Sequence, residues 1–123
     1  MSIQNVTGFD WDRGNLEKCQ KHGVEIAEIE SVFSQTLAVF PDPTHSREEE
    51  RFIGIGKTNR GRSLFVAFTL HSHSNEVLIR PITARYILRA VIISAFYIPE
   101  SPVYKGLVEG ITENLTARSI YRS

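Results

Sequence analysis

The number and spacing of the arginines in this chain suggest a chemical role for them. Arg51, Arg80 and Arg85 lie in or beside segments with the alternation of β-strands, and a guanidinium can hold a phosphate through two parallel hydrogen bonds. Glu50 and Tyr86 each stand next to one of these arginines, and a carboxylate or a phenol can transfer a proton. We predict that these five residues are catalytic, with the arginines binding a phosphate and Glu50 or Tyr86 moving a proton.

Cleavage of RNA without a metal ion needs groups of these kinds. One group takes the proton of a ribose 2′-hydroxyl, others stabilise the charge of the pentacoordinate phosphorane, and another protonates the leaving 5′-oxygen. The plainer alternative, which is favoured for any single residue, is that each charge simply lies in solvent at the edge of a sheet. Further basic residues of the same stretch are predicted to bind RNA: Lys57, Arg60, Arg62 and Arg89.

The net charge of the chain is zero, but its charges are divided unevenly. Residues 1–50 hold ten acidic and four basic residues, a net charge of −6, whereas residues 51–89 hold seven basic residues and one acidic residue, a net charge of +6. Residues 90–123 hold three of each. This division favours either a basic surface for a polyanion or an acidic and a basic face that match each other within the protein.

Other kinds of site have weaker support. Only His71 and His73 have a spacing at which two imidazoles can meet one ion, and no cysteine pair or third ligand stands at a characteristic distance from them. Cys19 lies among apolar residues of an expected helix and is predicted to be a buried small side chain. The glycines form no phosphate-binding loop of a familiar kind. We therefore expect neither a metal ion nor a cofactor.

Length and composition predict one soluble domain. A chain of 123 residues, of which 41% are hydrophobic and 23% charged, can bury a core without a disulfide or a metal. The single cysteine fits a reducing compartment. We find no signal peptide and no apolar run long enough to span a bilayer, so the expected location is the cytoplasm and no membrane partner is expected.

The segment from Glu48 to Arg89 is the centre of the expected fold, an antiparallel sheet with arginines on or beside one face. Alternation predicts its strands, and short polar runs predict its turns. Pro81 favours a sheet edge or a strand end. The predicted strands are residues 51–58, 62–70 and 76–83, and the predicted turns are residues 59–61 and 71–75.

The first of these strands is predicted to have two unlike faces. Arg51 and Lys57 share one face with two isoleucines, whereas Gly54 and Gly56 place no side chains on the opposite face. A strand without side chains on one face lets another segment approach its backbone closely. We therefore expect a close neighbour on the glycine face.

Helices are expected before this sheet. Gly23 is a suitable stop for the first helix. The second helix carries an apolar stripe at helical spacing, which leaves Glu25, Glu28 and Glu30 in solvent. The expected elements are a strand over residues 3–9, a helix over residues 12–22 capped by Asp10 or Asp12, a helix over residues 26–34, and a strand over residues 37–40.

The C-terminal third of the chain has two open interpretations. Residues 84–98 are apolar on nearly all sides, so their length favours a helix while their Val and Ile content tolerates a strand. Residues 103–123 have weak periodicity and can form a short helix, a strand or a loose tail.

Short motifs are spread over residues 9–86. They are F-D-W-D at 9–12, N-L-x-K-C-x-K-H-G-V at 15–24, an acidic V-F segment at 30–33, F-P-D-P-x-H at 40–45, E-E-R-F-I-x-I-G at 49–56, R-G-R-x-L-x-V at 60–66 and I-R-P-I-T-A-R-Y at 79–86. Taken together, they resemble the BrnT-type toxins of bacterial type II toxin–antitoxin pairs. Each motif alone would be unspecific.

The resemblance implies a RelE-like α+β fold, with N-terminal helices on a mainly antiparallel sheet. The apolar segment of this chain adds an expected apolar C-terminal helix and tail after the sheet. The resemblance implies a toxin domain over residues 1–98 and an extension over residues 99–123. It also implies a ribonuclease without a metal or cofactor, with RNA as its substrate and a BrnA-like antitoxin as its partner, as a homodimer or a heterotetramer with that antitoxin. The family's basic positions fall on Arg51, Arg80 and Arg85, and the resemblance brings Lys57 and His22 into consideration.

The chain departs from this family after Tyr86. BrnT-type chains continue into a polar, basic helix, whereas residues 87–98 are apolar here and Arg89 is their only basic residue. Such a helix would add contacts to phosphates. The departure supports an alternative, in which the chain is a catalytically weakened or inactive RelE-like scaffold that mainly binds an antitoxin or another protein.

Overall fold

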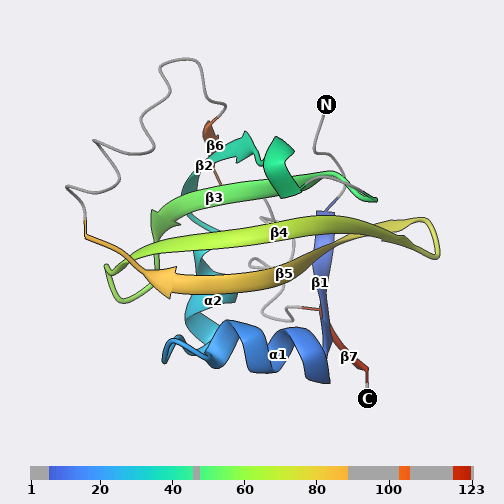
Figure 1. Cartoon of the computed structure of the whole chain (residues 1–123), viewed down its shortest axis with the longest axis horizontal. Helices are drawn as coiled ribbons and strands as arrows, with labels where there is room; N and C mark the ends of the chain where they lie inside the picture. Colours follow the sequence, from blue (N-terminus) through green and yellow to red (C-terminus); the bar gives the residue numbers. More distant parts are fainter. Residues whose placement is uncertain (1–5, 46–47, 89–102, 106–117, 123) are drawn as a thin grey trace.

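The computed structural model of the chain describes residues 6–45, 48–88, 103–105 and 118–122, whose strands form one sheet (Figure 1). The order of strands across this sheet is β6-β2-β3-β4-β5-β1-β7. The elements are β1 (Val6–Asp12), α1 (Arg13–Gln20), α2 (Ile26–Val32), β2 (Thr36–Pro41), the 3₁₀ helix η1 (Pro43–His45), β3 (Arg51–Lys57), β4 (Ser63–His73), β5 (Glu76–Tyr86), β6 (Val103–Lys105) and β7 (Arg118–Arg122).

The sheet is mixed, within an α+β fold. Strands β2 to β5 pair with their neighbours antiparallel, and β6 pairs antiparallel with β2. The first strand, β1, instead lies parallel to β5, and β7 lies parallel to β1. The expected antiparallel centre is confirmed, and the N-terminal strand is added to its side by a long-range parallel pairing.

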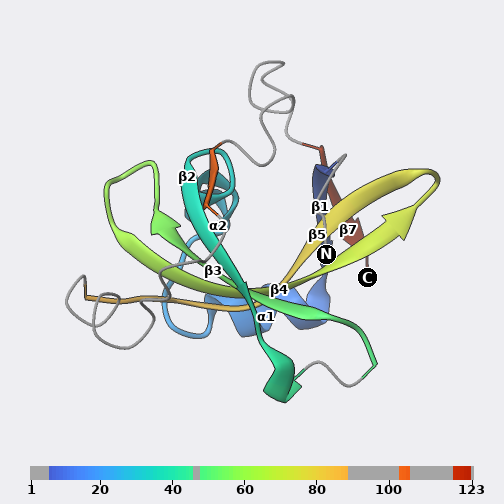
Figure 2. The same cartoon turned by 90° about the horizontal axis from the view of Figure 1, so that it is seen from above.

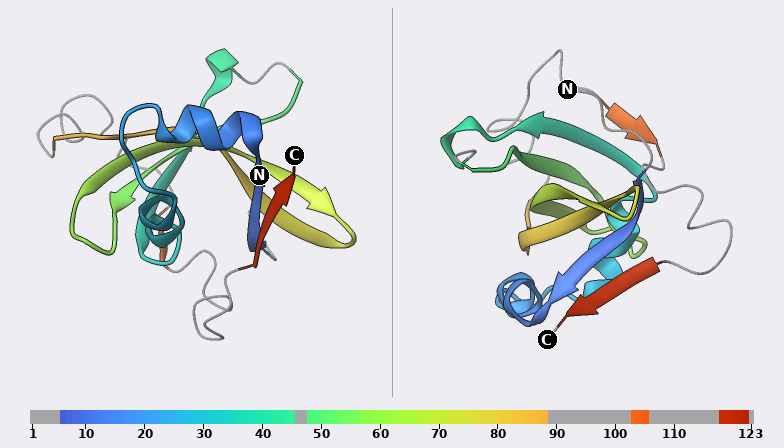
Figure 3. Two further views of the ribbon diagram at one scale, coloured as in Figure 1. Left: turned by 90° about the horizontal axis from the view of Figure 1, so that it is seen from below. Right: turned by 90° about the vertical axis from the view of Figure 1, so that its right-hand side faces the viewer.

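The two α-helices take different places around the sheet. The sheet curves around α2 (Figure 2), while α1 runs along β5 (Figure 3). The core lies between α2 and the sheet. Its centre is Phe33, whose ring centroid lies 5.7 Å from that of Phe9 and 5.1 Å from that of Phe68. The side of the sheet toward α2 is called the back face here, and the opposite side the front face.

The expected close approach to the glycine face of β3 is confirmed. A Cβ atom on Gly56 would lie 2.8 Å from the backbone oxygen of Thr36, and one on Gly54 would lie 3.1 Å from Cδ1 of Leu37. Both neighbours belong to β2. Glycine is therefore needed here because β2 and its side chains occupy the space that a Cβ atom would take.

The first helix begins as predicted and ends earlier. The Asp12 side chain accepts a hydrogen bond from the backbone N–H of Asn15 at 3.1 Å, and the Asn15 side chain accepts one from the backbone N–H of Asp12 at 2.7 Å. This reciprocal pair is a capping box. Gly23, at φ +77, follows the helix in the left-handed conformation expected of a stop.

Two expectations about polar residues are corrected. Glu28 is not in solvent but only 1% exposed, because the Tyr86 hydroxyl donates a hydrogen bond to its carboxylate and Arg60 lies 3.6 Å from it. The predicted turn over residues 71–75 is also too long. Strand β4 continues to His73, and the turn is Ser74 and Asn75, both at positive φ.

Pro81 lies within β5, at a local edge. The pairing of β5 with β1 ends at Ile79, and the register between β4 and β5 shifts near Pro81. Helix α1 takes over from β1 on that side, where the Asn15 side chain donates a hydrogen bond of 2.8 Å to the Pro81 carbonyl. A proline is tolerated here because no neighbouring strand needs its missing N–H.

The C-terminal expectations are settled only in part. Residues 84–86 belong to β5, so the strand is the correct one of the two interpretations there. Residues 87 and 88 lie in neither a helix nor a strand, and the rest of the expected apolar helix, residues 89–98, lies outside the described residues. Residues 103–105 and 118–122 are strands, one of the open interpretations. The division of the chain at residue 98 stays a prediction.

Candidate active site on the front face

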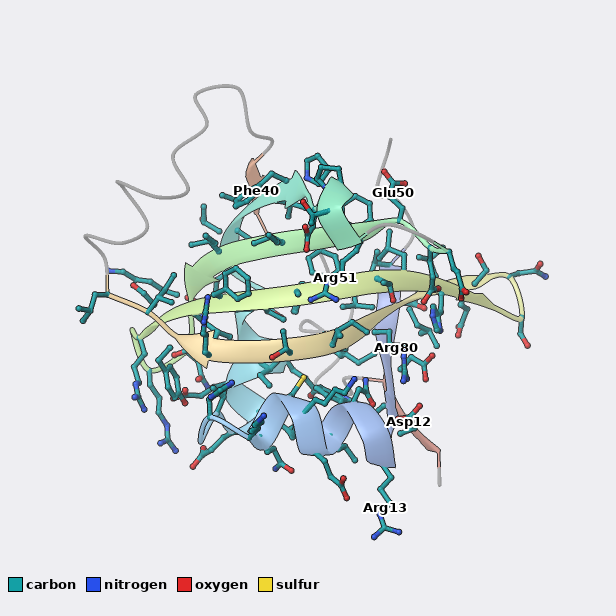
Figure 4. The ribbon with its side chains drawn as sticks, in the orientation of Figure 1. Asp12, Arg13, Phe40, Glu50, Arg51 and Arg80 are labelled. Carbon is teal, nitrogen blue, oxygen red and sulfur yellow. The ribbon has the colours of Figure 1, made fainter. Side chains whose placement is uncertain are left out.

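The front face carries the three arginines that the sequence singled out. Two of them, Arg51 and Arg80, are labelled in Figure 4. The pairing places Arg51 of β3 opposite Thr69 of β4, and Thr69 opposite Arg80 of β5. Further along β4, Phe65 lies opposite Arg85. Because residues that are directly paired, and alternate residues of one strand, share a face, the sheet presents all three guanidinium side chains on one side.

A hollow of about 330 Å³ opens on this face, and we call it the front hollow. Its lining combines two arginines with an aromatic ring, an aliphatic side chain and three other polar residues. Its volume lies at the lower end of the range that ligand-binding pockets have. The lining residues are Arg51, Ile53, Phe65, Thr83 and Arg85 from the strands, His22 from the segment after α1, and Asp42 from the segment after β2.

Arg51 is fixed in the front hollow by Asp42. The Asp42 backbone N–H donates a hydrogen bond of 2.8 Å to the Arg51 carbonyl, so the two residues are held side by side. The Arg51 Nε atom lies 3.4 Å from the Asp42 carboxylate, and the Arg51 side chain is 22% exposed. Contact with Asp42 through Nε therefore orients the side chain.

Arg80 shares the face of Arg51 but does not line the front hollow. Its Nη2 atom lies 2.8 Å from the Asp12 carboxylate and its Nη1 atom lies 4.0 Å from that of Asp10. In the F-D-W-D motif, Phe9 and Trp11 are buried in the core. The other two residues, Asp10 and Asp12, lie beside Arg80. The motif therefore serves packing and charge pairing at once.

His71 belongs to the same charged cluster. Its Nδ1 atom lies 2.8 Å from the Asp10 carboxylate and its Nε2 atom lies 2.9 Å from that of Glu49. The imidazole joins β1 to the segment that leads into β3. Among the described residues, no three His, Cys, Asp or Glu side chains are grouped so that they could hold a metal ion.

The predicted catalytic residues are only partly brought together. Arg51 and Arg85 line the front hollow. Glu50 is exposed and projects away from Arg51 (Figure 4). Tyr86 pairs with the core residue Leu64 and therefore faces the back of the sheet.

The predicted RNA-binding residues also separate. Lys57 is exposed at the far end of the strand that holds Arg51. Arg60 lies 3.6 Å from the carboxylates of Glu25 and Glu28, so it is paired with acidic residues at the start of α2. The Cζ atom of Arg62 lies 3.4 Å from the centroid of the Tyr86 ring, and Arg89 is outside the described residues.

Sequence reasoning missed Asp42, Phe65 and Thr83 as site residues. Their signals are weak. Phe65 stands in a run that is apolar on both faces, and Asp42 sits between two prolines in a predicted loop. A front-facing aromatic residue becomes meaningful only when the pairing places Phe65 opposite Arg85.

A comparison with protein families gives this site its context. The sequence profile described as "Ribonuclease toxin, BrnT, of type II toxin-antitoxin system" matches residues 11–90, which is more than half of the chain. The chain belongs to the BrnT family. The resemblance seen in the motifs is thereby confirmed. No curated protein matches this BrnT-family chain.

The front hollow lies within the part of the BrnT-family chain that the family profile matches. Every residue that lines the hollow falls within residues 11–90. The family is one of ribonuclease toxins, and an arginine-lined hollow is suited to an anionic substrate. None of the helices in the described ranges is long and apolar enough to cross a membrane.

We expect Asp12→Ala to lower the free energy of unfolding by about 1 kcal/mol, because the N-cap of α1 is lost. Asp12→Asn keeps a capping side chain and removes only the charge beside Arg80, so its loss should be smaller. Urea denaturation of both variants at pH 7 checks this order. Equal stability of Asp12→Ala and the unaltered chain would contradict it.

The Asp12 carboxylate should also make the free energy of unfolding depend on pH. The hydrogen bond from the Asn15 backbone, with the Arg80 guanidinium, holds the pKa of Asp12 below its ordinary value of 3.8. The folded state therefore favours the ionised form, and this stabilisation is present above pH 3.8 and is lost as the pH falls further. Asp12→Asn should lack this loss between pH 4 and pH 2, measured by urea denaturation.

We expect Tyr86→Phe to lower the free energy of unfolding by about 1–3 kcal/mol, because the buried Glu28 carboxylate loses its donor. Burial, and then the hydrogen bond to Glu28, raises the pKa of Tyr86 above its ordinary value of 10.0. The neutral phenol is therefore favoured by the fold, and its stabilisation is present below pH 10 and lost above the raised pKa. Urea denaturation from pH 7 to pH 11 should show that loss only with Tyr86 present.

Tyr86→Phe also tests the predicted catalytic role of this phenol. Since Tyr86 lies on the back face, we expect the variant to cleave RNA at the unaltered rate. A variant that is folded under the assay conditions but has lost cleavage would instead support proton transfer by Tyr86.

Proposed function

We propose that the front hollow is the active site of an endoribonuclease that cleaves RNA without a metal ion. The observation that carries the proposal is the convergence of Arg51 and Arg85, from β3 and β5, on one hollow that His22 also lines. Arg51 holds the scissile phosphate and stabilises the charge of the transition state. Arg80 stands in the same row but is paired with Asp12 and lies outside the hollow, and Arg85 binds the RNA on the other side.

The reaction follows from the groups in the lining. A base takes the 2′-hydroxyl proton, the 2′-oxygen attacks the phosphorus atom, and the 5′-oxygen leaves with a proton from an acid. The products are a 2′,3′-cyclic phosphate and a free 5′-hydroxyl. His22 and Asp42 lie at the hollow and are placed for proton transfer, whereas Glu50 and Tyr86 are not.

The family description also supports a partner. A type II toxin is neutralised by a protein antitoxin, and we propose a BrnA-like protein in that role, in a heterotetramer with the toxin and in the cytoplasm. The alternative is an inactive scaffold that only binds such a partner. Two contacts favour it, because Arg51 and Arg80 are each already paired with an aspartate.

Incubation of the purified chain with labelled single-stranded RNA in excess EDTA tests the proposal. We expect cleavage to fragments that end in a 2′,3′-cyclic phosphate, and no cleavage where the 2′-hydroxyl is replaced by hydrogen. Folded protein that leaves the RNA intact, or cuts it only when a divalent metal is added, would overturn metal-free cleavage. Intact RNA together with antitoxin binding would favour the scaffold.

A further inference from the structure

The front hollow contains an aromatic surface that binding of a phosphate does not need. Phe65 is half-buried on the front face, where it lines the hollow beside Ile53. The Cζ atom of Arg85 lies 5.0 Å from the centroid of the Phe65 ring. Arg85 itself is exposed. The hollow thus joins a flat apolar ring to a planar cation, next to the guanidinium of Arg51.

We propose that Phe65 and Arg85 bind one unpaired nucleobase of the RNA between them, beside the phosphate that Arg51 holds. This inference rests on the proposed function and adds the strandedness of its substrate. Bases stack on aromatic rings and on arginine guanidinium planes alike. Phe65 and Arg85 supply one surface of each kind at the same point of the hollow.

The geometry needs one movement. Stacked planes lie about 3.5 Å apart, so a base between ring and guanidinium requires about 7 Å where the present separation is 5.0 Å. Phe65 is anchored in β4, whereas Arg85 projects into solvent at the end of β5. The arginine side chain therefore withdraws by about 2 Å to admit the base, at the cost of a weak exposed contact with the ring.

The same geometry selects a single strand. In a duplex both faces of a base are stacked and its pairing edge is occupied, so the base cannot enter between Phe65 and Arg85. An unpaired base can, and the Thr83 hydroxyl, two residues before Arg85 on β5, belongs to the same lining. A hydroxyl both donates and accepts hydrogen bonds, so it is suited to bind the base edge.

Binding of a fluorescent 2′-O-methyl hexanucleotide, followed by anisotropy, tests the proposal without any cleavage. We expect Phe65→Leu, which keeps an apolar side chain, to weaken binding by roughly tenfold, the loss of one stacked base. Phe65→Trp should bind as tightly as the unaltered chain or more tightly. A perfect duplex of the same sequence should bind weakly, and with equal affinity, to the unaltered chain and to Phe65→Leu. Thermal melting confirms that the variants are folded.

A second set of oligonucleotides locates the base. Each carries one abasic position, and one of them should bind the unaltered chain as weakly as the complete RNA binds Phe65→Leu. With that RNA, Phe65→Leu should cause no further loss. Equal binding of the complete RNA by Phe65→Leu and the unaltered chain, or equally tight binding of the duplex, would overturn the proposal.

The outcome separates this inference from the proposed function. If Arg51→Ala abolishes cleavage but Phe65→Leu binds RNA as tightly as the unaltered chain, the base site is ruled out and the ribonuclease activity is supported. Binding that depends on Phe65, by a chain that cuts no RNA, would keep the base site and remove the ribonuclease.

Discussion

We expect Arg51→Ala to lower the rate of RNA cleavage by about 100- to 1,000-fold, as the loss of one preorganised donor to a transition state does in other enzymes. The guanidinium lies in the front hollow, oriented by Asp42. Arg51→Lys should restore only part of the rate, because an ammonium lacks the bidentate geometry. Single-turnover cleavage of a labelled RNA in EDTA measures all three chains.

Arg13→Ala is the matched control for this loss. Arg13 is 85% exposed on α1, is paired with Glu17, and projects away from the front face (Figure 4). We expect this variant to cleave RNA at the unaltered rate. A similar loss in both variants would point to a general effect of charge, and an unaffected Arg51→Ala would remove Arg51 from the active site.

The second large effect concerns stability. We expect Phe33→Ala to lower the free energy of unfolding by about 3–5 kcal/mol, the usual cost of removing a buried phenylalanine ring. Phe33 is fully buried, and its ring meets those of Phe9 and Phe68 edge to face. Because a domain is typically stable by about 5–15 kcal/mol, this variant should be close to unfolding. Urea denaturation measures the difference.

Leu88→Ala is the control for the core substitution. Leu88 is 75% exposed, so its truncation should change the free energy of unfolding by less than about 0.5 kcal/mol. A Phe33→Ala variant as stable as Leu88→Ala would mean that α2 does not close the core as described.

The local features of this fold could be predicted from the sequence. Alternation placed Arg51 and Lys57 on one face of β3, and the glycines of its other face correctly indicated a close neighbour. The apolar stripe of α2 was also correct. Its error at Glu28 arose because a stripe counts only apolar residues, whereas Glu28 is buried against Tyr86, which is 58 residues away in the chain.

The site could be predicted less completely, because long-range pairing decides it. Parity alone would turn Arg80 and Arg85, five residues apart on β5, to opposite faces, and the register shift between β4 and β5 near Pro81 brings them to one face. Likewise, only the parallel pairing of β1 with β5 places Asp12 on Arg80. Tyr86 was predicted to act beside Arg85. Once β5 extends to residue 86, however, parity alone turns Tyr86 to the back face.

The central claim is that this BrnT-family chain is a ribonuclease toxin that works through Arg51. Induction of the unaltered chain and of Arg51→Ala in bacterial cells, at matched protein levels, tests it most directly when growth and bulk RNA are followed together. We expect growth arrest with loss of RNA for the unaltered chain and neither effect for the variant. Normal growth with intact RNA in cells that contain the folded, unaltered chain would contradict it.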